Sequence, residues 1–273
     1  MPTIEGRDGT NIHVKEMGSG PPVILIHGWP LTGDMWEYQT VALVNAGFRV
    51  ITYDRRGFGH SAHPAQGYDY DTFADDLAAV IDGCALDNVA LAGFSMGGGE
   101  IARYLTRHGP AKIAKAALIS SVVPYVLKTA DNPEGVDRDV LEEMKSQIAR
   151  DRFAFLQTFA KPFYGAGLVS SPVSQGVLDW TFILAIMASP IATKACVDAF
   201  GTTDFRPDLA SFMIPTLIIH GTSDKTVPID ATGRAAAAGI PHATFIEYDG
   251  EPHGLFATAP DRLNDDLITF LRE

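Results

Sequence analysis

The chain has 273 residues, of which 46% are apolar and 20% are charged, as expected of a globular protein with a sizeable core. Its net charge of −12 disfavours nucleic acid and anionic membranes as partners. The two cysteines belong to no Cys/His cluster, so we expect neither a disulfide framework nor a zinc site.

Short apolar runs alternate with helical patterns along most of the chain. The run at 23–26 does not alternate with polar residues, which is typical of a strand buried on both faces. Such an alternation of strands and helices predicts an α/β fold, a mostly parallel sheet with helices on both faces. In chain order we expect strands over 23–26, 48–53, 88–93, 115–120, 215–220 and 243–248, and helices over 34–46, 71–82, 97–108 and 261–271.

The alternation is interrupted between about 125 and 205. Helical patterns occur there over 139–160, 173–188 and 191–200, without a convincing strand and with many aromatic residues. We therefore predict a helical cap over 125–205, inserted into a core formed by 1–124 and 206–273. The alternative, a helical half of an ordinary core, accounts less well for the break in the pattern.

One serine stands among glycines where a predicted strand ends and a predicted helix begins. The stretch Gly93-Phe94-Ser95-Met96-Gly97 has the G-x-S-x-G pattern of a nucleophile elbow. A tight strand-to-helix turn holds the apex residue at positive φ, and its neighbours must be small. The turn would expose the Ser95 hydroxyl and direct the Met96 N–H, at the positive end of the helix, toward an oxyanion.

Two other interpretations of this glycine-rich turn exist. The spacing Gly97-x-Gly99-x-x-Ala102 is similar to a dinucleotide fingerprint, but the next strand does not end in the acidic residue that this motif requires. The other interpretation is an ordinary turn with an unused serine. Partners elsewhere in the chain decide between these possibilities.

A nucleophilic serine needs a base, and the base needs an acid to orient it. Asp224 follows the predicted strand 215–220, and His253 follows the strand 243–248, so both should reach the edge of the sheet where Ser95 lies. The order Ser95, Asp224, His253 is that of a Ser-His-Asp triad in this kind of fold. The other histidines are not expected to act as the base: His220 in a strand, His13, His108 and His242 at surface positions, and His27, His60 and His63 in loops.

A second oxyanion donor is expected in the loop after strand 23–26. The Trp29 N–H is the candidate, because Pro30 has no N–H. His27 is expected to be structural. The loop 54–61 follows another strand; bracing of the site is favoured over phosphate binding, since no P-loop pattern accompanies it.

The motifs HGWP, DRRGFGHS, GFSMGGGEIARYLTRHG, HGTSDKTVP and DGEPHG together make the chain similar to the α/β-hydrolase superfamily over nearly its whole length. More narrowly, it resembles the bacterial cofactor-free haloperoxidases (perhydrolases) and arylesterases. The resemblance implies Ser95 as nucleophile, His253 as base, Asp224 as the orienting acid, and the Trp29 and Met96 N–H groups as oxyanion hole, without metal or haem. In that group proline after the tryptophan is typical of haloperoxidase-type members, whereas some arylesterases have leucine there.

The predicted reaction is therefore cleavage of a small acyl or aryl ester, with the acyl group passed to water or to hydrogen peroxide. Alternatives are a C–C bond or lactam/amide hydrolase with the same triad, and a non-catalytic ligand receptor. A cytoplasmic protein is expected, because no apolar segment long enough for a membrane span occurs, and a homo-oligomer is possible. The expected pocket residues are Trp29, Pro30, Phe94, Phe159, Trp180, Phe182 and Ile186.

Overall fold

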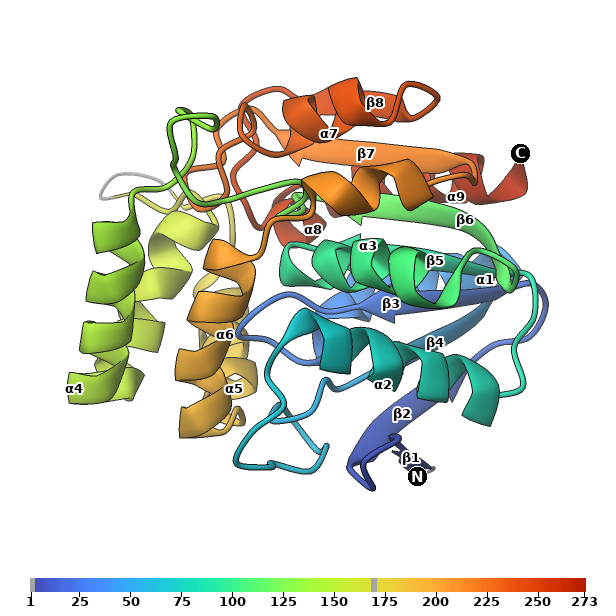
Figure 1. The fold of residues 1–273 in the computed structure, drawn as a ribbon, viewed down its shortest axis with the longest axis horizontal. Coiled ribbons are helices and arrows are strands. Elements are labelled where there is room, and N and C mark those ends of the chain that lie inside the picture. The colour runs from blue at the N-terminus through green and yellow to red at the C-terminus, as the bar shows by residue number, and fades with distance from the viewer. Residues whose placement is uncertain (1–2, 168–170) are drawn as a thin grey trace.

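The computed structural model describes residues 3–167 and 171–273, and these form a single mostly parallel sheet with helices on both of its faces (Figure 1). The strand order is β1-β2-β4-β3-β5-β6-β7-β8. Strand β2 pairs antiparallel with β1 and β4, and every neighbouring pair from β4 to β8 is parallel. The strands are β1 Thr3–Glu5, β2 Asn11–Met17, β3 Pro22–Ile26, β4 Arg49–Tyr53, β5 Val89–Phe94, β6 Ile113–Ile119, β7 Thr216–Gly221 and β8 Thr244–Tyr248.

Two buried apolar clusters lie on the two faces of the sheet. Successive residues of β3 alternate between them: Ile24 and Ile26 belong to one cluster, Val23 and Leu25 to the other. Helices α2, α3 and α7 cover one face, and α1, α8 and α9 cover the opposite face (Figure 1). Their bounds are α1 Glu37–Asn45, α2 Tyr70–Gly83, α3 Met96–His108, α7 Gly233–Gly239, α8 Leu255–Thr258 and α9 Pro260–Arg272.

The α/β fold and each predicted strand and helix of the sheet domain are confirmed, with ends that differ by a few residues. The expected helix 34–46 begins as a 3-10 turn, η1 Gly33–Trp36, and continues as α1. Strands β1 and β2 and the short helices α7 and α8 were not predicted. The short, largely polar strand β1 and the four-alanine helix α7 carry too little hydrophobic pattern to be recognised.

Three helices occupy the segment between β6 and β7 and pack against one another beyond the carboxyl ends of the parallel strands (Figure 1). They are α4 Arg138–Phe163, α5 Gln175–Ile186 and α6 Pro190–Thr202. The backbone of α4 is non-helical at Asp151. In the described chain no single helix is long and apolar enough to cross a membrane. Of the described helices, only α5 and α6 taken together have that length and apolar character, and this pair is bent by 99°.

Candidate active site

Ser95 occupies the sharp turn between β5 and α3. Its backbone has φ 53° and ψ −117°, a strained conformation, and its N–H donates to the Ile119 carbonyl of β6 at 2.9 Å. A Cβ on Gly93 would lie only 2.5 Å from the Gly97 carbonyl oxygen. Gly93 is therefore required by close contact between the two arms of this turn, and Gly97 by its close approach to β3, where a Cβ would lie 2.5 Å from the Ile26 carbonyl oxygen.

Ser95, His253 and Asp224 come together at the carboxyl ends of β5, β8 and β7. The Ser95 Oγ lies 3.0 Å from His253 Nε2, and His253 Nδ1 lies 2.6 Å from Asp224 Oδ2. All three residues are buried, and Ser95 is only 6% exposed. With Nδ1–H donating to the carboxylate, Nε2 of a neutral imidazole is free to accept the serine proton.

The carboxylate of Asp224 is held on both oxygens. Its Oδ1 accepts hydrogen bonds from the Thr226 and Val227 N–H groups, both at 2.8 Å, and His220 Nε2 lies 3.2 Å from Oδ2. Burial by itself would raise the pKa of Asp224, but attraction to His253 and hydrogen bonding from His220 and His253 outweigh it. The net result is a pKa well below the ordinary range of an aspartate, so the carboxylate stays ionised.

His220 was expected to be buried in its strand, which is confirmed, but its contact with Asp224 was not predicted. Its Nε2 also lies 3.0 Å from the Val227 carbonyl oxygen. Both neighbours of Nε2 are acceptors, which requires a proton on Nε2, while the buried Nδ1 has no partner among the described residues. The Nε2–H of His220 is therefore a donor to Asp224. This contact could have been predicted from the sequence, because His220 lies at the end of the strand that Asp224 follows.

Two main-chain N–H groups flank the serine and donate to no acceptor within the described parts of the chain. Met96 is the first residue of α3, so its N–H has no partner inside the helix. Trp29 follows Gly28 in the chain. A Cβ on Gly28 would lie 3.1 Å from the Ser95 Cβ and 2.5 Å from the Phe94 ring. The loop after β3 thus approaches Ser95 closely.

A buried polar network fixes the loop that carries Trp29. The Arg55 N–H donates to His27 Nε2 at 2.9 Å, and the Arg55 guanidinium donates to the His27 carbonyl at 2.7 Å and pairs with Glu100. Burial, and next the charge of Arg55, hold the pKa of His27 well below its ordinary value. His27 is therefore neutral, with Nδ1–H donating to the Gly28 carbonyl at 2.9 Å. Arg55, in the loop 54–61, braces the site in this way, and His27 is structural.

A cavity of about 260 Å³ opens at Ser95 and His253, and most of its lining is apolar. Trp29 and Phe159, two of the expected pocket residues, line it. The other lining residues come largely from the segment 126–144 and from α4, α6 and the loop after β7, and were not predicted. They are Val126, Val136, Val140, Leu141, Met144, Pro162, Phe200, Lys225, Thr226 and Val227.

The remaining expected pocket residues do not line this cavity. The Phe94 ring lies 4.8 Å from that of His253 and packs in the core behind it, since strand neighbours point to opposite faces. Pro30 is buried in the loop after β3. Phe182 lines a surface hollow between α4 and α5, and Ile186 packs half-buried against the core.

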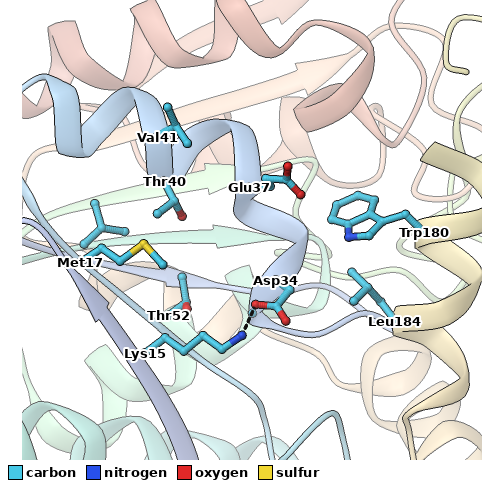
Figure 2. Close-up of a pocket in the computed structure, with 11 residues that line it drawn as sticks. Lys15, Met17, Asp34, Glu37, Thr40, Val41, Thr52, Trp180 and Leu184 are labelled. Atoms are coloured by element: carbon cyan, nitrogen blue, oxygen red, sulfur yellow. Dashed lines mark hydrogen bonds and ion pairs between the residues drawn. The ribbon is translucent and has the colours of Figure 1, made fainter. Parts of the chain in front are cut away.

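Trp180 lies in a different cavity, of about 320 Å³, between α5 and the N-terminal part of the sheet domain (Figure 2). Its indole faces Glu37 and Leu184, and the ion pair of Lys15 with Asp34 lies beside them (Figure 2). Helix α5 is apolar on nearly all sides, so its sequence pattern could not show which aromatic side chain faces the serine. The expectations for Trp180, Phe182, Ile186, Phe94 and Pro30 as cavity lining are thus corrected.

The expectation that His13 is a surface residue is also wrong. His13 is only 6% exposed, because β2 pairs with β4 and the loop after β4 covers it. His242 is exposed, as expected, whereas His108 is partly buried; His60 and His63 are exposed in that loop.

Comparison with known proteins gives consistent matches over the whole chain. The family model described as the alpha/beta hydrolase fold matches residues 21–260. The chain is 44% identical over 275 residues to non-heme chloroperoxidase CPO-A1 of Kitasatospora aureofaciens, covering 100% of both chains. It is 36% identical over 276 residues to the bifunctional esterase/perhydrolase DCH of Acinetobacter calcoaceticus, again covering 100% of both. The crystal structure of bromoperoxidase from Bacillus anthracis superposes with a TM-score of 0.96 at 46% identity, covering 100% of this chain and 99% of that one.

Proposed function

The chain belongs to the α/β-hydrolase fold family and is a hydrolase, and we propose that Ser95, His253 and Asp224 cleave small acyl or aryl esters through an acyl-enzyme. The observation that supports this most is the unbroken line of contacts from Asp224 Oδ2 through His253 to the Ser95 Oγ, at 2.6 and 3.0 Å. We propose further that the same acyl-enzyme transfers its acyl group to hydrogen peroxide. The similarity to a bifunctional esterase/perhydrolase supports this second step.

In the first half-reaction the Ser95 oxygen attacks the ester carbonyl while His253 Nε2 takes the hydroxyl proton. The carbonyl oxygen becomes an oxyanion, which the Trp29 and Met96 N–H groups stabilise. His253 then returns the proton to the leaving alcohol or phenol as the ester C–O bond breaks. Asp224 keeps its charge throughout and stabilises the imidazolium, and the low pKa of its carboxyl suits this role.

In the second half-reaction His253 deprotonates water or hydrogen peroxide, which attacks the acyl carbon. The Ser95 oxygen leaves with the proton from His253, and the product is a carboxylic acid or a peracid. A released peracid oxidises a halide ion in solution and is itself reduced to the acid. Halogenation therefore needs no halide site in the protein, which fits the chloroperoxidase names of the relatives.

The cavity favours small, uncharged acyl or aryl groups. Valine, leucine, methionine and phenylalanine side chains make most of its wall, and its volume is about 260 Å³. Burial of apolar substrate surface against such a wall contributes roughly 25 cal/mol per Å². We propose that segment 125–205 acts as a cap that closes this cavity over a core of 1–124 and 206–273, since α4, α6 and residues 126–144 supply much of the wall.

Pro30 is the residue proposed to favour peroxide. Proline fixes its own φ and restricts the preceding residue, so it directs the Trp29 carbonyl as well as the N–H. A carbonyl turned toward the acyl group would accept a hydrogen bond from hydrogen peroxide, which has a second O–H that is not used in the attack.

A competition assay tests the function. One ester, for example a p-nitrophenyl acetate, is supplied with and without hydrogen peroxide, and both acid and peracid are quantified. We expect turnover in water alone and formation of peracid when peroxide is present. Absence of ester turnover would refute the proposed hydrolysis, turnover without peracid would refute the peroxide step alone, and an unchanged product ratio in Pro30→Leu would refute the role of that residue.

A further inference from the structure

A second cluster of histidine and aspartate lies at the end of β4, outside the cavity that holds Ser95. Strand β2 runs antiparallel to β4 with Val14 opposite Tyr53, so the next residues, His13 and Asp54, are neighbours across the two strands. The Asp54 N–H donates to the His13 carbonyl at 3.0 Å. His60 belongs to the loop that follows β4 and returns to the same place.

The potential ligand atoms of this cluster converge. One ring nitrogen of each histidine and one carboxylate oxygen of Asp54 all lie within 4.8 Å of one another. The His60 Nδ1 is 3.5 Å from Asp54 Oδ2. Two ligands each about 2.1 Å from a zinc ion in tetrahedral geometry are separated by about 3.4 Å, so this pair already has nearly the required spacing.

The side chains of this cluster are poorly satisfied by one another. His13 is 6% exposed, and its Nε2 is buried with no hydrogen-bond partner among the described residues. A separation of 3.5 Å between His60 Nδ1 and the carboxylate is at the limit of a hydrogen bond. A buried polar atom without a partner is unfavourable and calls for an explanation. A cation between the three side chains would supply one.

The surrounding backbone holds these ligands in place. Asp54 Oδ1 accepts the Gly33 N–H and Oδ2 accepts the His60 N–H, both at 2.8 Å, which leaves lone pairs on the carboxylate free. The His13 N–H donates to the Ser61 Oγ at 2.8 Å, and this hydroxyl in turn donates to the Asp54 carbonyl. Such outer contacts orient ligands before an ion binds.

We propose that His13, Asp54 and His60 bind one divalent transition-metal ion such as Zn²⁺. Two imidazoles with one carboxylate suit zinc and its neighbours and not Mg²⁺ or Ca²⁺, which prefer oxygen ligands. The exposed His60 side chain, with 55% of its surface accessible, gives the ion a path from solvent, and water completes its coordination. This site lies apart from the proposed reaction: the ion ties β2 to the loop 54–62 and stabilises the fold.

Local electrostatics agree with this assignment. Lys15 does not leave an uncompensated positive charge near the ion, because it is paired with Asp34 (Figure 2).

The test is a zinc titration of the chelator-treated, full-length protein, followed by calorimetry and by thermal unfolding. We expect one Zn²⁺ per chain and a rise in melting temperature, with Mg²⁺ giving neither. Loss of a residue that only orients a metal ligand typically weakens metal binding about 10–100-fold. His60 is itself a ligand in this proposal, so His60→Ala should weaken zinc binding at least about 100-fold. That residue is exposed, so the variant should fold; circular dichroism checks this.

His63→Ala is the matched control, because His63 is an exposed histidine of the same loop and lies outside the cluster. It should bind zinc as the unmodified protein does, and ester turnover should be the same in both variants. Equal zinc affinity in His60→Ala and the unmodified protein would overturn the proposal, as would a lack of stoichiometric binding or an equal loss in His63→Ala.

Discussion

Asp224 and Asp54 are buried carboxylates that follow parallel strands of one sheet, and each lies beside two histidines. Asp224 follows β7 and contacts His253 and His220; Asp54 follows β4 and lies near His13 and His60. Residue types are therefore the same at the two places, although both histidines at Asp224 are buried and His60 at Asp54 is exposed. What differs is the group that the second nitrogen of each ring meets.

At Asp224 the far nitrogen of His253 meets the Ser95 hydroxyl, and the cavity beside it admits a substrate. At Asp54 the buried Nε2 of His13 meets no partner in the described structure, and His60 opens to solvent. One arrangement is suited to moving a proton, and the other to holding a cation. Identical side chains thus support different chemistry according to the third group they meet, and the predictions below test this difference.

The largest effect is expected from Asp224→Asn. The amide can donate to His253 Nδ1 and so favour the wrong tautomer of the imidazole, which costs about 10⁴-fold in kcat in triads of this kind. Turnover of a p-nitrophenyl ester measures this loss in kcat. The comparison is His60→Ala, which changes a neighbour of the other aspartate, Asp54. A fall of less than tenfold in Asp224→Asn would separate this carboxylate from the reaction.

Gly28→Ala should lower kcat by about 10²–10³-fold, the typical loss for one oxyanion donor. The added methyl would meet the Phe94 ring and the Ser95 Cβ, so the loop must move and carry the Trp29 N–H away from the serine. Thermal unfolding distinguishes displacement from global damage. Unchanged kcat in a folded variant would exclude the proposed second donor.

The pH dependence of kcat/KM should show a single ionisation. Asp224 has a lowered pKa and remains charged, so only protonation of His253 abolishes activity as pH falls. The rate should drop tenfold per pH unit on the acid side and stay level above it. A hundredfold drop per unit would mean that two groups must lose protons, which contradicts an Asp224 that is already ionised.

His220→Phe should reduce kcat by about tenfold, since hydrogen bonds to charged groups contribute roughly 1.5–3 kcal/mol and Asp224 keeps its two backbone donors. His220→Gln retains an N–H donor and should recover part of the loss. Equal activity in the Phe and Gln variants, both stably folded, would mean that His220 only fills space.

The sequence predicted the features that depend on local constraints. The elbow glycines are required within a few residues of Ser95, and Asp224 and His253 follow recognisable strands, so their convergence at one edge of the sheet could be expected. The cavity wall could not, because α5 is apolar on nearly all sides and Trp180 turns to the other cavity. The His13–Asp54 pairing depends on the register of β2, a strand that the sequence pattern did not reveal.

Trapping of the acyl-enzyme tests most directly whether Ser95 carries the acyl group. The protein is mixed with p-nitrophenyl acetate, quenched in acid within the first turnover, and its peptides are analysed by mass spectrometry. We predict one acetyl group per chain on the peptide that contains Ser95, lost faster when hydrogen peroxide is added, and none in Ser95→Ala. Acetyl on another residue with full turnover in Ser95→Ala would contradict the proposed mechanism.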